Sequence, residues 1–128
     1  MSNVFTFALT TRWSDMDALG HINHASYFTY FEQARIAWWY EKGICLNDLI
    51  GPVLVKAEAE YLRSLSAPAK LTIELKAHMP GRSSYWIDYD LFESGALCAK
   101  GKTKVVWVDY QSNKSIPLPE SMLEHINT

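Results

Sequence analysis

The chain has 128 residues, which fits a single domain spanning residues 1–128 and is long enough to bury a real core. Hydrophobic residues make up 48% of it and charged residues 20%, which argues against disorder, and a formal net charge of -2 gives no reason to expect a nucleic-acid partner. The longest apolar run is too short to span a bilayer, so we expect no membrane insertion.

The two cysteines, Cys45 and Cys98, stand far apart and lack the spacing of metal ligands. With no signal peptide in the sequence, we expect two reduced thiols in a cytoplasmic protein. Buried structural roles are favoured for both, because neither has an obvious base nearby in the sequence.

The first expected element is a strand, because apolar Phe5, Phe7 and Leu9 alternate with more polar residues. A polar loop follows at 15–23. The pattern then becomes helical over 24–42, with Asn23 as a good N-cap and Gly43 as a good stop. Because apolar residues occupy most sides of this helix, we expect it to be buried on most sides.

Four stretches after the helix alternate with period two and predict strands at 53–61, 70–77, 85–91 and 97–107. Short turns, such as those at 79–82 and 93–95, should join them, which indicates antiparallel pairing. The polar segment after Asp109, with two prolines, predicts a turn and a short terminal segment. One helix can cover one face of such a sheet, so dimerisation through the sheet is plausible.

The polar loop and the helix together carry a specific motif, RWSDMDALGHINHASYFTYFEQAR, at residues 12–35. This stretch resembles the hotdog-fold thioesterases of the 4-hydroxybenzoyl-CoA thioesterase type, through RWSDMD, GHINHA, Tyr27, YFE and AR. Two weaker matches support it by their position, EYLR at 60–63 and GRSS at 81–84. The resemblance covers the chain up to about Asp109.

The resemblance implies an α+β hotdog fold, in which a five-stranded antiparallel sheet wraps around one long apolar helix. It also implies homodimers that pair their sheets, often as tetramers, with an acyl-CoA or related thioester hydrolysed at the subunit interface. The residue that matches the family's catalytic carboxylate is Asp17, and the first amides of the helix, around His24, would polarise the thioester carbonyl. No metal and no tightly bound cofactor are expected, since CoA is part of the substrate.

Thioester hydrolysis suits these residues chemically. A carboxylate such as Asp17 acts as a nucleophile or as a base. The free N–H groups at the start of a helix form an oxyanion site, and Gly20 lets the backbone approach a ligand closely. The thiol leaving group is acidic, with a pKa of roughly 8.5 by analogy with cysteine, so a strong general acid is not essential.

Other polar residues of the motif keep two interpretations each. Asp15 is expected to be structural, bonding to N–H groups of its loop. His21 could orient substrate or act as a base, but a structural hydrogen bond is at least as plausible, and the imidazole of His24 could compete with Asp17. Glu32 is a second-choice catalytic residue, ranked below an ion pair with Arg35.

The CoA phosphates call for cations, and Arg82 and Arg63 are the better candidates. Ser83 and Ser84 could bond a pantetheine amide or merely start a strand, while Gly20 and Asn23 belong to the substrate-binding loop. The three lysines at 100, 102 and 104 share one face of a strand. We slightly favour a solvated edge strand over a phosphate-binding role for them.

The leading prediction is a cytoplasmic acyl-CoA thioesterase. An acyl-carrier-protein thioesterase is the alternative within enzymes, because the acidic carrier would favour a basic patch at the site. A non-catalytic protein that binds acyl thioesters is the alternative outside enzymes. The acyl group, the choice between nucleophile and base, and the choice between dimer and tetramer stay open.

Overall fold

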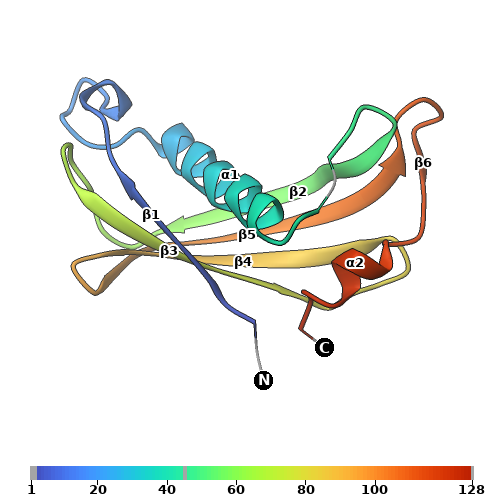
Figure 1. Ribbon diagram of the computed structural model, residues 1–128. Helices are drawn as coiled ribbons and strands as arrows, with labels where there is room; N and C mark the ends of the chain where they lie inside the picture. Colours follow the sequence, from blue (N-terminus) through green and yellow to red (C-terminus); the bar gives the residue numbers. More distant parts are fainter. Residues whose placement is uncertain (1–2, 45, 128) are drawn as a thin grey trace.

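One long helix lies across the concave face of a curved sheet in this computed structural model, which describes residues 3–44 and 46–127 (Figure 1). The elements are β1 (Phe5–Thr10), α1 (His24–Glu41), β2 (Ile50–Tyr61), β3 (Lys70–His78), β4 (Ser84–Glu93), β5 (Ala96–Asp109), β6 (Lys114–Ser115) and α2 (Glu120–Leu123). The predicted α+β architecture and its element order are confirmed, and the terminal segment adds the two-residue strand β6. The prediction for Cys45 lies outside the described residues.

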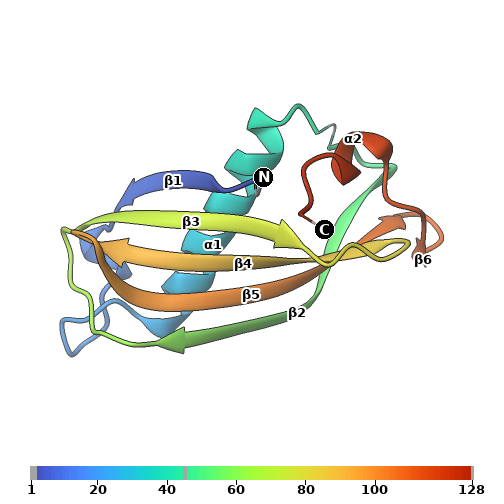
Figure 2. The same cartoon turned by 90° about the horizontal axis from the view of Figure 1, so that it is seen from below.

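The strands follow the order β1-β3-β4-β5-β2, and every neighbouring pair is antiparallel (Figure 2). β4 and β5 form a tight hairpin, since Ser94 and Gly95 have the positive φ values, 51° and 81°, that a two-residue hairpin turn requires. Our expectation that short turns join all four later strands is wrong for β2. This strand pairs with β5 at the far edge, so segment 62–69 crosses the end of the sheet to reach β3.

The local signals around α1 act as predicted. Asn23 caps the helix, accepting a hydrogen bond from the Ala25 N–H at 3.0 Å. The helix ends at Glu41, and Gly43 follows with φ at 69°, a left-handed conformation that favours glycine. Both ends of the helix are thus fixed by residues that the sequence singles out.

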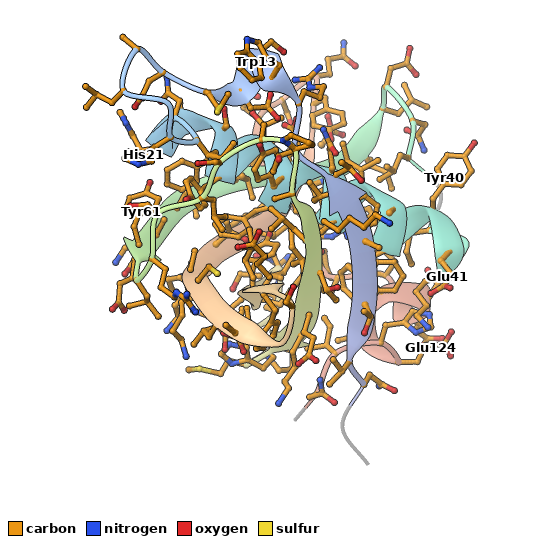
Figure 3. The ribbon with its side chains drawn as sticks, turned by 90° about the vertical axis from the view of Figure 1, so that its left-hand side faces the viewer. Trp13, His21, Tyr40, Glu41, Tyr61 and Glu124 are labelled. Carbon is orange, nitrogen blue, oxygen red and sulfur yellow. The ribbon has the colours of Figure 1, made fainter. Side chains whose placement is uncertain are left out.

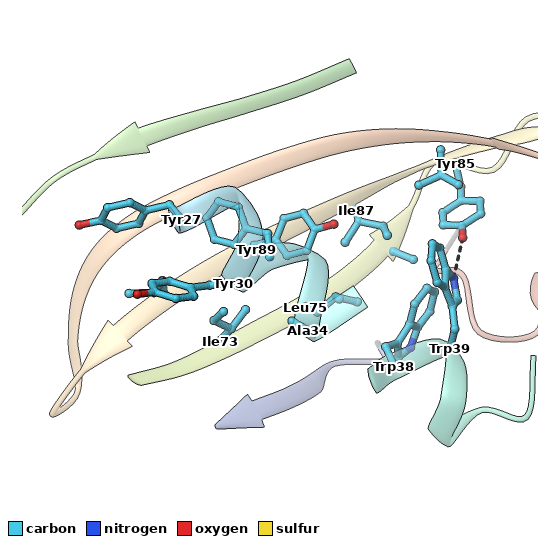
Figure 4. Packing of buried hydrophobic residues seen from close by; sticks show 14 of the residues in the cluster. Tyr27, Tyr30, Ala34, Trp38, Trp39, Ile73, Leu75, Tyr85, Ile87 and Tyr89 are labelled. Carbon is cyan, nitrogen blue, oxygen red and sulfur yellow. Dashed lines mark hydrogen bonds between the residues drawn. The ribbon is translucent and has the colours of Figure 1, made fainter. Parts of the chain in front are cut away.

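The core is formed between the buried side of α1 and the inner face of the sheet (Figure 4). Trp39 donates a hydrogen bond from Nε1 to the Tyr85 hydroxyl at 3.0 Å, which satisfies two buried polar groups. Phe31 stacks on Tyr89 with ring centroids 4.7 Å apart. The same Phe31 ring lies over Gly101, where an added Cβ would come within 2.5 Å of it.

Within a single chain, the expectation that α1 is buried on most sides is wrong. Phe28, Ile36 and Tyr40 leave 36%, 45% and 82% of their surface exposed. The sheet covers only one side of the helix, so the outward side stays open. The edge strand β2, which pairs with β5 on one side and with no described strand on the other, also exposes apolar side chains, among them Leu54 and Val55. A single chain therefore leaves apolar surface on both α1 and β2.

Candidate active site

The loop between β1 and α1 is anchored by the buried carboxylate of Asp15. This group accepts hydrogen bonds from the Arg12 N–H at 2.9 Å and from the Tyr30 hydroxyl at 2.6 Å, and it pairs with the Arg12 guanidinium at 3.0 Å. Burial alone would raise the pKa of Asp15, but the hydrogen bonds from Tyr30 and Arg12 outweigh it and lower that pKa below 3.8. The structural role expected for Asp15 is confirmed.

Asp17 lies two residues further on, in a very different setting. Its side chain is exposed, and one oxygen, Oδ1, accepts hydrogen bonds from the N–H groups of Leu19 at 2.9 Å and His21 at 3.4 Å. The turn is closed by the Asp17 N–H, which donates to the His21 carbonyl at 2.8 Å, and by Gly20, whose φ is 78°. Within the described ranges Oδ2 has no hydrogen-bond partner, so one oxygen orients the carboxylate while the other remains free.

The first turn of α1 offers one free donor next to this loop. The Ala25 N–H is taken by the Asn23 side chain, and the Ser26 N–H by the Asn23 carbonyl at 2.9 Å. Among the residues that the structure describes, none accepts a hydrogen bond from the His24 N–H. The start of the helix also carries partial positive charge, so this amide is suited to a developing oxyanion.

A pocket of about 260 Å³ opens beside this amide. Its walls come from the loop, the start of α1 and the end of β2, and they comprise His21, Ile22, His24, Tyr27, Tyr61, Leu62, Arg63 and Ser64. Figure 3 shows His21 and Tyr61 side by side at this end of the molecule. Four of the residues singled out from the sequence thus lie together at or beside the pocket: Asp17 through its turn with His21, and His21, His24 and Arg63 directly.

Sequence reasoning missed Tyr61 as a member of this site. Its hydroxyl donates to the His24 carbonyl at 3.3 Å, and its ring meets that of Tyr27 edge-on at 4.9 Å. Burial raises the pKa of Tyr27 to about 12, so both phenols stay protonated near neutral pH. The available signal was its position at the end of the second predicted strand, two residues before Arg63.

Glu32 lies away from this pocket, eight residues or about 12 Å along α1 from His24. Its carboxylate is 57% exposed and stands 3.9 Å from the Arg35 guanidinium. The expected ion pair with Arg35 is confirmed, although it is long.

The second set of residues predicted to bind CoA does not lie at the candidate site of the same chain. Arg82, Ser83 and Ser84 lie at the start of β4, beside the end of β5 and close to α2. The loop that carries Asp17 lies at the opposite end of the sheet (Figure 2). Our expectation that Arg82 is near the site entrance therefore fails within a single chain, because β4 runs the full length of the sheet between them.

The lysines of β5 face outward, on the side of the sheet away from α1. The strand register places two of them between carboxylates of both neighbouring strands, as Glu60–Lys100–Asp90 and Glu58–Lys102–Asp88. Lys100 pairs with Asp90 at 3.6 Å. The charges of Lys100 and Lys102 are thus compensated, whereas Lys104 is paired with Lys56 and Trp86 and has no carboxylate opposite it in either neighbouring strand.

Comparison with known proteins decides the family. A model of the thioesterase-like superfamily matches residues 11–126. The chain belongs to the thioesterase-like superfamily. A relative from Nostoc punctiforme, a 1,4-dihydroxy-2-naphthoyl-CoA hydrolase, is 26% identical, with 97% of this chain and 87% of the relative covered. The YsmA protein of Bacillus subtilis is 30% identical, with 84% of this chain and 75% of that protein covered.

Solved structures of similar proteins confirm the hotdog fold of this thioesterase. The PA2801 protein from Pseudomonas aeruginosa superposes with a TM-score of 0.88 at 36% identity, covering 93% of this chain and 95% of that one. A 1,4-dihydroxy-2-naphthoyl-CoA thioesterase from Synechocystis gives a TM-score of 0.90 at 19% identity, covering 96% and 95%. Family membership and the hydrolases among the relatives identify the chain as a thioester hydrolase.

Two further findings concern the described part of this thioesterase. Within residues 3–44 and 46–127, no group of three or more His, Cys, Asp and Glu side chains is arranged to hold a metal ion. None of the helices described there is long and apolar enough to cross a membrane.

Proposed function

We propose that this thioesterase hydrolyses acyl-CoA thioesters in the pocket beside the start of α1. The observation that carries the proposal is the His24 N–H, from which no described residue accepts a hydrogen bond, next to a loop that presents the Asp17 carboxylate. The amide would donate to the carbonyl oxygen as negative charge develops on it. Losing one such donor typically costs about 3–4 kcal/mol of barrier.

Asp17 supplies the chemical step in either of two ways. As a nucleophile it attacks the carbonyl carbon, expels the CoA thiolate and forms an anhydride that water then hydrolyses. As a base it takes a proton from the water that attacks the carbonyl, and the same thiolate leaves. We propose that neither route requires a metal or a tightly bound cofactor. The Asp17 carboxylate supplies the nucleophile or the base, and the His24 N–H stabilises the negative charge that develops on the carbonyl oxygen.

Two histidines and one glutamate are the reserve candidates. His21 and His24 both line the pocket, which keeps either residue as a candidate to meet the substrate. Glu32 ranks below them, because about two turns of α1 separate it from the free amide.

The CoA moiety needs cations for its phosphates, and Arg63 lies at the pocket to meet them. Arg82, Ser83 and Ser84 could contribute only from a second chain. Antiparallel pairing of β2 with its copy would set the end of one β2 beside the start of the other, which is the end of the sheet that carries Arg82. We therefore propose a homodimer through β2, supported by the apolar side chains exposed along this edge.

Two narrower points follow from the described residues. The carboxylates opposite Lys100 and Lys102 do not favour docking of an acidic acyl carrier protein at those two residues, and we keep CoA as the preferred carrier. Cys98 is a free, buried thiol, and the cytoplasm remains the compartment that we propose.

The direct test is a panel of acyl-CoA thioesters assayed with a free-thiol reagent, alongside the same acyl groups on acyl carrier protein. We expect turnover of at least one CoA thioester, with higher kcat/KM than for its carrier-protein counterpart. Binding without turnover across the panel would instead support the non-catalytic alternative.

A further inference from the structure

Arg35 is a charged residue buried in the core of this protein. It projects from the fourth turn of α1, and its side chain is only 7% exposed. The guanidinium donates one hydrogen bond, from Nη1 to the Tyr89 hydroxyl at 3.1 Å, and that hydroxyl is 2.9 Å from Oγ1 of Thr103. A buried cation is destabilising unless close partners compensate its charge.

The compensation that Arg35 receives from the described residues is incomplete. A guanidinium has five N–H donors, and one of them is used in a hydrogen bond to a neutral hydroxyl. The carboxylate of Glu32 stands 3.9 Å from Nη2, too far for a hydrogen bond, and it is mostly solvated. The Trp39 ring adds a weak contact, with its centroid 5.8 Å from Cζ. Donors of Arg35 therefore remain available.

These donors border a pocket of about 260 Å³ between α1 and β2. Apolar side chains form most of its wall, and Arg35 is the cation among its lining residues, which are Phe28, Thr29, Phe31, Glu32, Arg35, Leu54, Ala57 and Thr103. A largely apolar cavity with one buried guanidinium, whose lining carboxylate, Glu32, is mostly exposed to solvent, fits a ligand that has an apolar body and an anionic end.

This pocket and the candidate active site are both lined by residues of α1 and β2. At the start of α1, His24 and Tyr27 contact Tyr61 of β2. Further along the helix, Phe28, Phe31 and Arg35 line one pocket together with Leu54 and Ala57 of the same strand. The free His24 amide and the Glu32–Arg35 level of α1 are about 12 Å apart along the helix axis. An acyl group that extends from the thioester along α1 would bring its far end to Arg35.

We propose that Arg35 recognises an anionic oxygen at the far end of the acyl group, so that the preferred substrates are ω-carboxyacyl thioesters. The inference rests on the proposed function, since it places the thioester at the start of α1. The carboxylate of the substrate takes two parallel hydrogen bonds from the guanidinium, and the exposed Glu32 side chain turns towards solvent. Arg35 thereby selects the acyl group and takes no part in bond breaking.

The test compares CoA thioesters that differ only in a terminal carboxylate: hexanoyl with adipoyl, octanoyl with suberoyl, and decanoyl with sebacoyl. Charge-assisted hydrogen bonds in a buried site support a preference of about tenfold or more in kcat/KM for the carboxylated member of at least one pair. Arg35→Met, which removes the charge but keeps much of the volume, should abolish this preference. Arg35→Lys should restore part of it, and Lys42→Met, which removes the cation that directly follows α1, should retain it.

Two results would overturn the proposal: a wild-type enzyme that favours the uncharged member of every pair, or an unchanged preference in folded Arg35→Met. If Arg35→Met does not fold, the proposal is tested by measuring ligand binding to the wild-type protein. Octanoate should then raise its Tm more than the uncharged octanamide does, and equal shifts would refute the role of Arg35. A wild type that binds octanoate in preference to octanamide but cleaves no thioester would refute the proposed function while leaving the Arg35 site intact.

Discussion

At the scale of single residues, two carboxylates two positions apart have different roles because their surroundings differ. Asp15 is buried and receives hydrogen bonds from Arg12 and Tyr30, whereas Asp17 is exposed and, among the described residues, its side chain accepts hydrogen bonds from its own turn alone. Fully bonded groups stabilise a fold, and a carboxylate with a free oxygen beside a pocket is available for chemistry. This contrast separates the anchor of the loop from the candidate catalyst.

Asp15→Asn should therefore lower the free energy of unfolding by about 1–3 kcal/mol at neutral pH, because a buried charge-assisted network is lost. The pKa of Asp15 is lower in the folded protein than its ordinary value of 3.8, so its stabilising contribution is complete above about pH 4 and declines as the pH falls. Urea unfolding at neutral and acid pH measures both effects. The gap between wild type and Asp15→Asn should narrow in acid, and equal stability at neutral pH would contradict the anchor role.

At the scale of elements, the periodicities and caps of the sequence predict α1 and the five long strands, because each signal acts within a few residues. The pairing of β2 with β5 depends on contacts between distant segments, and no local pattern encodes it. Asp15, Asp17 and His24 were found from one contiguous motif. Tyr61 was missed because it reaches the site only through that long-range pairing.

Gly101→Ala tests the close approach of α1 to the middle of β5. The new Cβ would lie 2.5 Å from the Phe31 ring, so helix or ring must shift, and we expect a loss of about 1–3 kcal/mol in stability. Thermal and urea unfolding measure this loss. Adding Phe31→Leu should make the double variant more stable than the two separate losses predict, and simple additivity would argue against the contact.

At the scale of the whole molecule, the unpaired β2 edge and the exposed side of α1 predict a homodimer at minimum, and a tetramer is compatible with the same chain. Light scattering at micromolar concentration should give at least twice the mass of the chain. Val55→Lys, which places a charge on the exposed edge, should shift the mass towards the monomer. A monomeric wild type would remove the basis for a shared site.

Arg82→Ala tests whether the far end of the sheet serves the site of a partner chain. We expect KM for a CoA thioester to rise more than kcat falls, because binding of the carrier is largely the same in the ground and transition states. Lys114→Ala, at an exposed position on β6, is the control. An unchanged KM would assign Arg82 to structure.

Mixed dimers sharpen this test. Combining Arg82→Ala chains with Asp17→Asn chains creates one site with neither change if Arg82 serves its partner. Activity at low substrate concentration should then exceed that of either variant alone. If mixing brings no recovery although mixed dimers form, Arg82 does not act across the interface.

The central claim is that Asp17 performs the chemical step, and Asp17→Asn tests it most directly. The amide keeps the size of the side chain and an oxygen for the Leu19 and His21 N–H groups, but it removes the charge. We predict that kcat for a CoA thioester falls by roughly a hundredfold or more, the scale that general-base catalysis supplies, while unfolding and mass stay as in the wild type. Oxygen-18 incorporation into Asp17 would then distinguish the nucleophile from the base. Near-full activity of Asp17→Asn, together with loss of activity in His24→Ala or Glu32→Gln, would contradict the assignment.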